Sequence, residues 1–337
     1  NRVVAGFRAL TKEMHYPLVS QAASGSRMWD IDGNEYIDVT MGFGVNLFGH
    51  NPPFVTDAIA SQLSRGMQLG PQADLAGEVA ELICELTGNE RAAFVSTGTE
   101  AVMIACRLAR AATGRDTIVV FNGAYHGQHD STIAVTNPET GDVQAIPGVP
   151  GVSRNAVADT VMLNYDDPAS LQYIAENADR LAAVLVEPVQ SRRPELQPRE
   201  FLHQLREVTE RGGIALIFDE MITGFRCHPG GAQGLFGVRA DLVTYGKIVG
   251  GGLPIGVVSG RRRFMDVVDG GDWSYGDASW PSVQTTFVSG THSKHPLTMA
   301  AARAVLQHLK DQGPQLQRRL DERTAAFANE LNAYFAE

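Results

Sequence analysis

The chain has 337 residues, of which 44% are hydrophobic and 20% are charged, so it can bury a large core and hold part of a second domain. Its formal net charge of −10 argues against a dedicated nucleic-acid or anionic-membrane binder, although one local pocket can still hold an anionic ligand. No apolar run approaches the ~20 residues that span a bilayer, and no signal peptide is evident.

The three cysteines, Cys84, Cys106 and Cys227, are far apart and form no CxxC pair. This pattern predicts no disulfide framework and favours a reducing cytoplasm. The chain starts without a methionine and stops inside a helical pattern, so we expect it to be a piece of a longer polypeptide.

Apolar and polar residues alternate over residues 25–39 around Asp32-Gly33, which predicts a hairpin near the N-terminus. Short apolar runs rich in Val and Ile then alternate with helical patterns, which is typical of an α/β fold whose mostly parallel central sheet has helices on both faces. The expected strands are 92–95, 117–121, 182–186, 213–218 and 241–245, and the clearest helices are 99–114, 199–213 and one from about Pro296.

Polar or aromatic residues follow each of these five strands. Ligands bind at the carboxyl edge of parallel α/β sheets, so we expect these residues to meet at one site. In chain order the stretches are Ser96 to Glu100, Asn122 to Gly127, Glu187-Pro188, Asp219-Glu220 and Gly246-Lys247.

The "STGTEA" stretch combines a glycine with the capping-box spacing of Thr97 and Glu100. Gly98 allows close backbone approach, and the free N–H groups of a helix start bind phosphate well. An ordinary helix cap would show the same spacing. The stretch is neither a Walker loop nor a GxGxxG fingerprint.

Asp219 and Lys247 each follow a buried strand pattern. A buried carboxylate needs a partner, and Asp219 would suit a cationic ring nitrogen, although strand-end aspartates commonly cap turns. Lys247 lies beside glycines that leave room for an aldehyde to reach its amine, which favours a nucleophile over a surface lysine.

Tyr125 is placed to stack on a flat ligand ring, although it could also be a core aromatic. His126 and His129 lack a third ligand, so we predict no metal site. A phosphate cradle, a stacking ring, a ring-nitrogen carboxylate and a shielded lysine are together the attachments that pyridoxal phosphate needs.

Five blocks, "VSTGTEAVMIACRLARAATGRD", "AYHG", "VEPV", "FDEMITGFR" and "GKIVGGGLPIG", resemble the signatures of class III, fold-type I pyridoxal-phosphate aminotransferases. Glutamate-1-semialdehyde aminomutases are the nearest familiar relatives, and the resemblance runs from about Tyr16 to the end of the chain. It implies an N-terminal arm and hairpin (1–45), a large cofactor-binding domain (46–286) and the start of a small, truncated α+β C-terminal domain (287–337).

The resemblance also implies roles for single residues. Lys247 would form the Schiff base with the cofactor and later move a proton, and Asp219 would keep the pyridine nitrogen protonated. Met221, where relatives usually have Val, would cover one ring face and Tyr125 the other. The phosphate would be held by Gly98 and Thr99, and the further expected cofactor contacts are Thr97 and His126.

Gly290-Thr291 matches a Gly-Thr pair that reaches the phosphate of the partner subunit in relatives, which implies a homodimer with shared active sites. The donor would be glutamate or glutamine. An arginine that commonly receives the donor's carboxylate in relatives lies beyond the matching region of this chain.

Two stretches, residues 41–54 and 190–202, resemble aminotransferase domains embedded in polyketide and nonribosomal peptide synthases. They imply a 3-oxoacyl thioester acceptor on an acyl carrier protein. Expected substrate contacts are Gly42, Phe43, Glu187 and Arg192, with Arg193 as an alternative to Arg192 or both as a plain exposed basic pair. The competing interpretations are a glutamate-1-semialdehyde aminomutase and a non-catalytic docking relative.

Overall fold

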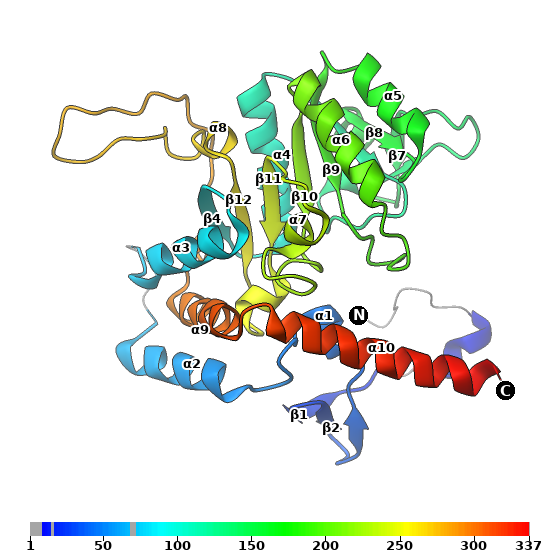
Figure 1. Ribbon diagram of the computed structural model, residues 1–337, viewed down its shortest axis with the longest axis vertical. Coiled ribbons are helices and arrows are strands. Elements are labelled where there is room, and N and C mark those ends of the chain that lie inside the picture. Colours follow the sequence, from blue (N-terminus) through cyan, green and yellow to red (C-terminus); the bar gives the residue numbers. More distant parts are fainter. Residues whose placement is uncertain (1–8, 15–16, 68–71, 337) are drawn as a thin grey trace.

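The computed structural model describes residues 9–14, 17–67 and 72–336, and Figure 1 shows its arrangement. The expected N-terminal arm therefore lies partly outside the described residues, as does Tyr16. The core of the fold is a seven-stranded sheet whose order is β4-β12-β11-β10-β9-β5-β8. Its strands are β4 (Arg91–Val95), β5 (Thr117–Phe121), β8 (Thr160–Leu163), β9 (Leu181–Val186), β10 (Ala215–Asp219), β11 (Leu242–Tyr245) and β12 (Gly256–Gly260).

The sheet is parallel except for β12, which pairs antiparallel with both β11 and β4. All five predicted strands are confirmed within one or two residues. The sequence analysis missed β8 and β12. Because the parallel strands share one direction, their carboxyl ends meet at one edge of the sheet, as predicted.

Helices cover both faces of the sheet (Figure 1), also as predicted. Neighbouring residues of one strand point to opposite faces, so Ala183 and Leu185 pack with α4 (Gly98–Thr113) in one core, while Val184 and Val186 belong to the other core. That second core includes residues of α2 (Pro53–Arg65), α3 (Leu75–Thr87), α5 (Pro168–Glu176), α6 (Arg199–Gly212), α7 (Gly231–Phe236) and α9 (Pro296–Gln312).

The predicted N-terminal hairpin is confirmed. It is formed by β2 (Arg27–Asp30) and β3 (Glu35–Ile37), and β1 (Ser20–Ser24) adds a third antiparallel strand. The buried Asp30 side chain accepts hydrogen bonds from the backbone N–H groups of Asp32 and Asn34, which fixes the turn. The short elements that complete the described chain are η1 (Ala9–Met14), α1 (Met41–Gly44), η2 (Asp130–Thr132), β6 (Ala134–Thr136), β7 (Ala145–Pro147), η3 (Arg154–Val157), η4 (Lys247–Gly250) and α8 (Arg262–Met265).

The C-terminal part consists of a long loop and two helices. Residues of α9 such as Met299, Val305 and Leu306 are fully buried in the large core, whereas α10 (Gln315–Ala336) extends away along the molecule (Figure 1) and buries only Gln317 among the described residues. No strand follows β12 in the described part of the chain. The α+β character of the C-terminal domain therefore stays a prediction.

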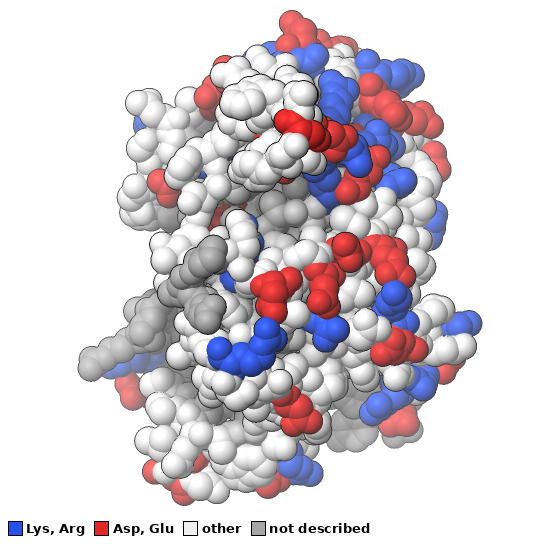
Figure 2. Space-filling model, turned by 90° about the vertical axis from the view of Figure 1, so that its left-hand side faces the viewer, with Lys and Arg blue, Asp and Glu red and all other residues white. Residues whose placement is uncertain are grey.

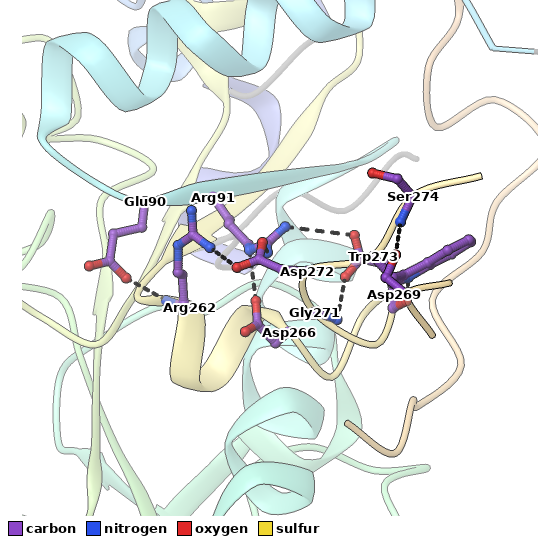
Figure 3. Close-up of polar contacts among 10 residues, drawn as sticks. Glu90, Arg91, Arg262, Asp266, Asp269, Gly271, Asp272, Trp273 and Ser274 are labelled. Atoms are coloured by element: carbon purple, nitrogen blue, oxygen red, sulfur yellow. Dashed lines mark hydrogen bonds and ion pairs between the residues drawn. The ribbon is translucent and has the colours of Figure 1, made fainter. Parts of the chain in front are cut away.

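An ion-pair network holds the base of the loop that follows α8 (Figure 3). Arg91, at the start of β4, pairs through Nε with Asp266 and through Nη2 with Asp272, each at 2.7 Å. Arg262 also pairs with Asp272, and its backbone N–H donates to Glu90 at 2.6 Å. Beyond this base the loop protrudes from the molecule (Figure 1).

Charges of both signs are interspersed on the face shown in Figure 2. On the neighbouring helices α3 and α9, Glu78 pairs with Arg303 and Glu85 with Lys310. This face carries no broad basic patch of the kind that binds nucleic acid. Within the described ranges, no helix combines the length and the apolar character needed to cross a membrane.

Candidate active site

A cavity of about 210 Å³ lies where the loops after β4, β5, β9, β10 and β11 meet. Ligand sites for drug-sized molecules are about 300–1,000 Å³, so this cavity suits a single-ring compound better than a dinucleotide. Its walls include most of the residues that the sequence analysis selected: Thr97, Gly98, Thr99, Tyr125, His126, Glu187, Asp219, Met221 and Lys247.

The capping box at the start of α4 is confirmed. The Thr97 hydroxyl accepts from the backbone N–H of Glu100 at 3.2 Å, and the Glu100 carboxylate accepts from the N–H groups of Ser96 and Thr97 at 2.7 and 2.9 Å. The next N–H groups, those of Gly98 and Thr99, have no intrahelical acceptor because they belong to the first turn. They and the positive end of the helix face the cavity as an anion site.

Two close approaches shape this cradle. A Cβ at Gly98 would lie 2.8 Å from the sulfur of Met221, and a Cβ at Gly246 would lie 2.7 Å from the same atom. Met221 therefore packs between the start of α4 and the residue before Lys247, and a larger residue at either position would have to displace its side chain.

Gly127→Ala is expected to destabilise the fold more than Gly114→Ala. Both glycines have positive φ, +81° and +67°, but a Cβ at Gly127 would lie 2.4 Å from the hydroxyl of Thr99, whereas nothing lies within 4 Å at Gly114. The clash should add about 1–3 kcal/mol to the loss of unfolding free energy. Denaturant unfolding of both variants measures the difference. Equal losses of unfolding free energy would show that the contact with Thr99 does not affect stability.

Asp219 is buried, and its carboxylate accepts three hydrogen bonds. Its side chain is 3% exposed, and Oδ2 lies 2.8 Å from Nδ1 of His126. Oδ1 accepts from the hydroxyl of Thr244 at 3.0 Å and from the backbone N–H of Met221 at 3.2 Å. These contacts fix the position and orientation of the carboxylate.

His126 therefore acts on the site through Asp219. The sequence analysis grouped it with the cofactor contacts, and the ring does line the cavity, but its Nδ1 is bound to Asp219. Thr244 was missed, although its signal was present: a hydroxyl in the apolar run "LVTY" that is fully buried in the structure. A buried hydroxyl needs a partner, and Asp219 is that partner.

Lys247 begins η4 directly after β11 and reaches the cavity wall. Its φ is +42°, an unusual value for a residue with a Cβ, and such strain is found mainly where the surroundings enforce it for function. The other lysines are Lys12 and Lys310, which are exposed, and Lys294, which is partly exposed; they contact Glu13, Glu85 and Gln72, respectively. Lys247 is thus the lysine of this chain that lines the cavity.

Glu187 joins two walls of the cavity. Its Oε2 accepts from the backbone N–H of Tyr125 at 3.2 Å and its Oε1 from that of Ser191 at 2.8 Å. Burial raises the pKa of this carboxyl, and the bond from Ser191 opposes that rise. The Arg192 guanidinium lies over the ring of Tyr125, with 5.8 Å between its carbon and the ring centroid.

Three predicted site residues lie away from this cavity. Thr291 is exposed and lines a separate cavity of about 740 Å³ near α3 and β4. Gly42 lines a third cavity beside Gly251, and Phe43 is 81% exposed. No described contact brings these three residues to Lys247 within one chain, so their roles stay predictions.

The segment that contains Gly42 and Phe43 is nevertheless tied to the site. Residues 41–44 all have positive φ, and the Arg226 guanidinium donates to the carbonyl of Gly44. Arg226 also donates through Nε to the carbonyl of Ile222 at 2.8 Å, and Ile222 lines the cavity. Arg226 ends the "FDEMITGFR" block, but nothing in the sequence indicated that it would contact the segment of residues 41–44.

Glu220 is a second buried carboxylate, but it faces away from the cavity. It accepts from the N–H groups of Ala232 and Gln233 and from the hydroxyl of Thr223, at 2.5, 3.0 and 2.9 Å. Burial raises the pKa of Glu220 to about 7 despite these donors.

Glu220→Gln is expected to change how stability depends on pH. A carboxyl whose pKa is raised on folding stabilises the protein fully below its unfolded pKa, here near 4.5, and that contribution is lost as the pH rises through about 7. The unfolding free energy of the native chain minus that of the variant should fall by about 3 kcal/mol across this window. Denaturant unfolding at a series of pH values tests this, and a constant difference would contradict it.

The sequence of this chain matches a known protein family. Residues 9–336 match the family model described as Aminotransferase class-III. Curated relatives include the glutamate-1-semialdehyde 2,1-aminomutase of Acetivibrio thermocellus, which is 41% identical over 303 residues, 87% of this chain and 66% of the relative. Glutamate-1-semialdehyde 2,1-aminomutase 2 of Lachnoclostridium phytofermentans is 37% identical over 95% of this chain and 72% of its own length.

Solved structures of aminotransferases have the same fold as this chain. A transaminase with PLP bound shows a TM-score of 0.78 at 36% identity, with 87% of this chain and 67% of that chain covered. An omega-transaminase from Sphaerobacter thermophilus shows a TM-score of 0.80 at 33% identity, with 89% and 67% covered. The chain spans about two thirds of the length of the curated relatives it matches. Its fold is that of the fold-type I transferases, and the chain belongs to the class III aminotransferase family.

Proposed function

We propose that this chain carries the cofactor-binding and proton-transferring part of a pyridoxal-phosphate-dependent aminotransferase. The observation that supports this most strongly is the cavity itself, where Lys247, the buried Asp219 and the open start of α4 meet. A non-catalytic docking relative would have no reason to keep a buried carboxylate with three donors beside a strained lysine.

The residues present fit pyridoxal phosphate. The N–H groups of Gly98 and Thr99 suit its phosphate, because they belong to the first turn of α4, lack intrahelical acceptors and lie at the cavity. The buried carboxylate of Asp219 suits a protonated ring nitrogen. Tyr125 and Met221 can cover the two ring faces. Lys247 supplies the amine for the aldehyde.

When bound, pyridoxal phosphate supplies an electron sink for a carbon that loses a proton. Asp219 would hold the proton on the ring nitrogen, and His126 and Thr244 orient its carboxylate. Lys247 takes the proton from the substrate carbon and returns it at the neighbouring position. Loops from five strands place these groups at one edge of a rigid sheet.

For the reaction itself, we place the exchange catalysed by glutamate-1-semialdehyde 2,1-aminomutases first, because curated relatives with up to 41% identity carry that name. This reaction moves an amino group within one substrate and needs no external donor. The test is to incubate full-length protein with glutamate-1-semialdehyde alone. Isomerisation without a donor supports the assignment, and a strict need for an amino donor contradicts it.

A second candidate is amino transfer from glutamate or glutamine to a 3-oxoacyl thioester on an acyl carrier protein. It is favoured by the resemblance of residues 190–202 to such synthase-embedded domains and by Arg192, whose guanidinium lies over the ring of Tyr125. Mass spectrometry of a loaded carrier protein after incubation with donor and enzyme detects the amine. We further propose a cytoplasmic homodimer in which Thr291 completes the partner's phosphate site.

A further inference from the structure

The loop after β9 is fastened to the loop that carries Tyr125. Glu187 accepts from the backbone N–H groups of both Tyr125 and Ser191, and the Gln190 amide donates to the carbonyl of Asn122 at 2.9 Å. The Glu187 and Gln190 side chains are buried, at 4% and 1% exposure. Because two buried polar groups link the loops, the residue that follows Ser191 has a fixed position relative to Tyr125.

That residue is Arg192, which is exposed and follows Ser191, a residue that lines the cavity. Tyr125 is 50% exposed, whereas His126 and Asp219 on the same walls are 3% exposed, so Tyr125 marks the open side. The Arg192 guanidinium lies over the Tyr125 ring at 5.8 Å. Stacking on an aromatic ring restrains a guanidinium without using its N–H donors.

The charges around the cavity leave Arg192 free to bind an anion. The described residues that line the cavity include two carboxylates, Glu187 and Asp219, and one basic amine, Lys247. The guanidinium of Arg226 is already bound to the carbonyls of Ile222 and Gly44. Within the described ranges, Arg192 has no carboxylate or carbonyl partner, so its N–H donors face solvent beside the ring of Tyr125.

We propose that Arg192 binds an anionic oxygen group, a carboxylate or a phosphate, on the substrate whose reacting end reaches Lys247. This inference rests on the proposed function. The planar fork of a guanidinium donates two parallel hydrogen bonds to either group. An anion approaching a chain of net charge −10 also needs such a local cation.

The test compares Arg192→Gln with Arg193→Gln in the full-length, cofactor-loaded protein. Arg193 is the matched control, because it is the next residue, is also exposed and loses the same charge, while its backbone N–H still donates to Gln190. Calorimetry measures the binding of two unreactive probes, glutarate and phosphopantetheine. Arg192→Gln should bind at least one of them about tenfold more weakly, and Arg193→Gln should match the native protein.

The two probes separate the sources of the anion. If Arg192→Gln weakens the binding of glutarate alone, Arg192 binds a carboxylate of the substrate. If it weakens the binding of phosphopantetheine alone, Arg192 binds the phosphate of the carrier. The proposal is overturned if the native protein binds neither probe, or if the two variants bind both probes alike. Where glutarate binding is weakened, the proposal is also overturned if Arg192→Gln slows an amine donor without any acidic group as much as it slows glutamate, because Arg192 would then act only by supporting Tyr125.

Failure of the proposed function would look different. In that case the native protein itself would show no visible absorbance from the bound cofactor. If Arg192→Gln keeps this absorbance and binds both probes as tightly as Arg193→Gln does, the inference about Arg192 fails while the proposed function stands. Arg192→Lys, which keeps the charge, should recover part of the lost affinity.

Discussion

Lys247→Ala is expected to lower the rate of amino transfer by about 10⁴-fold or more, because the amine that links to the cofactor and moves the proton is lost. Lys247 is the lysine that lines the cavity, and its φ is an unusual +42°. The protein should also lose the visible absorbance that depends on the covalent link. The rate is measured in single-turnover experiments with an amino donor and the absorbance on the purified protein.

Lys310→Ala is the matched control for this prediction. Lys310 is exposed on α9 and pairs with Glu85, remote from the cavity walls, so its loss should leave both rate and absorbance unchanged. Wild-type turnover in Lys247→Ala, or an equal loss in both variants, would contradict the role given to Lys247.

Asp219→Asn should slow the same step by about 10²–10³-fold while leaving the cofactor bound. The substitution keeps the shape of the side chain but removes the charge that holds a proton on the ring nitrogen. The cradle at Gly98 and the amine of Lys247 remain, so affinity for the cofactor should change far less than the rate. Rates and absorbance spectra over a range of pH values measure both quantities.

Glu220→Gln separates this effect from the general loss of a buried carboxylate. Glu220 is the next residue and is equally buried, but it accepts from α7 on the side away from the cavity. Its substitution should change stability, with little effect on the rate at saturating cofactor. A similar loss of rate in both variants would mean that Asp219 acts only through the fold.

Much of the large domain could be predicted from the sequence, because strands buried on both faces must be short and apolar. Two strands of the sheet, β8 and β12, were not predicted. β12 reads "GVVSG", with a glycine at each end, and enters the sheet antiparallel between two parallel strands. β8 lies at the edge of the sheet and has only four residues, "TVML", so its signal in the sequence is short.

The site residues could be predicted where a reactive side chain comes directly after a predicted strand. Asp219 and Lys247 could be selected because a charge after a buried strand needs a reason. The bond between His126 and Asp219 could not, because 93 residues separate the two in the chain and only the order of β5, β9 and β10 brings them together. The same holds for the contact of Arg192 with Tyr125, which depends on how two loops pack.

The most direct measurement of the central claim is reduction of the cofactor-loaded protein with borohydride, followed by mass mapping of its peptides. The chain contains four lysines, so each can be examined separately. Our account predicts that the reduced pyridoxyl phosphate is found on the peptide with Lys247 and on no other. Label on Lys12, Lys294 or Lys310 with none on Lys247, or no label on any lysine, would contradict it.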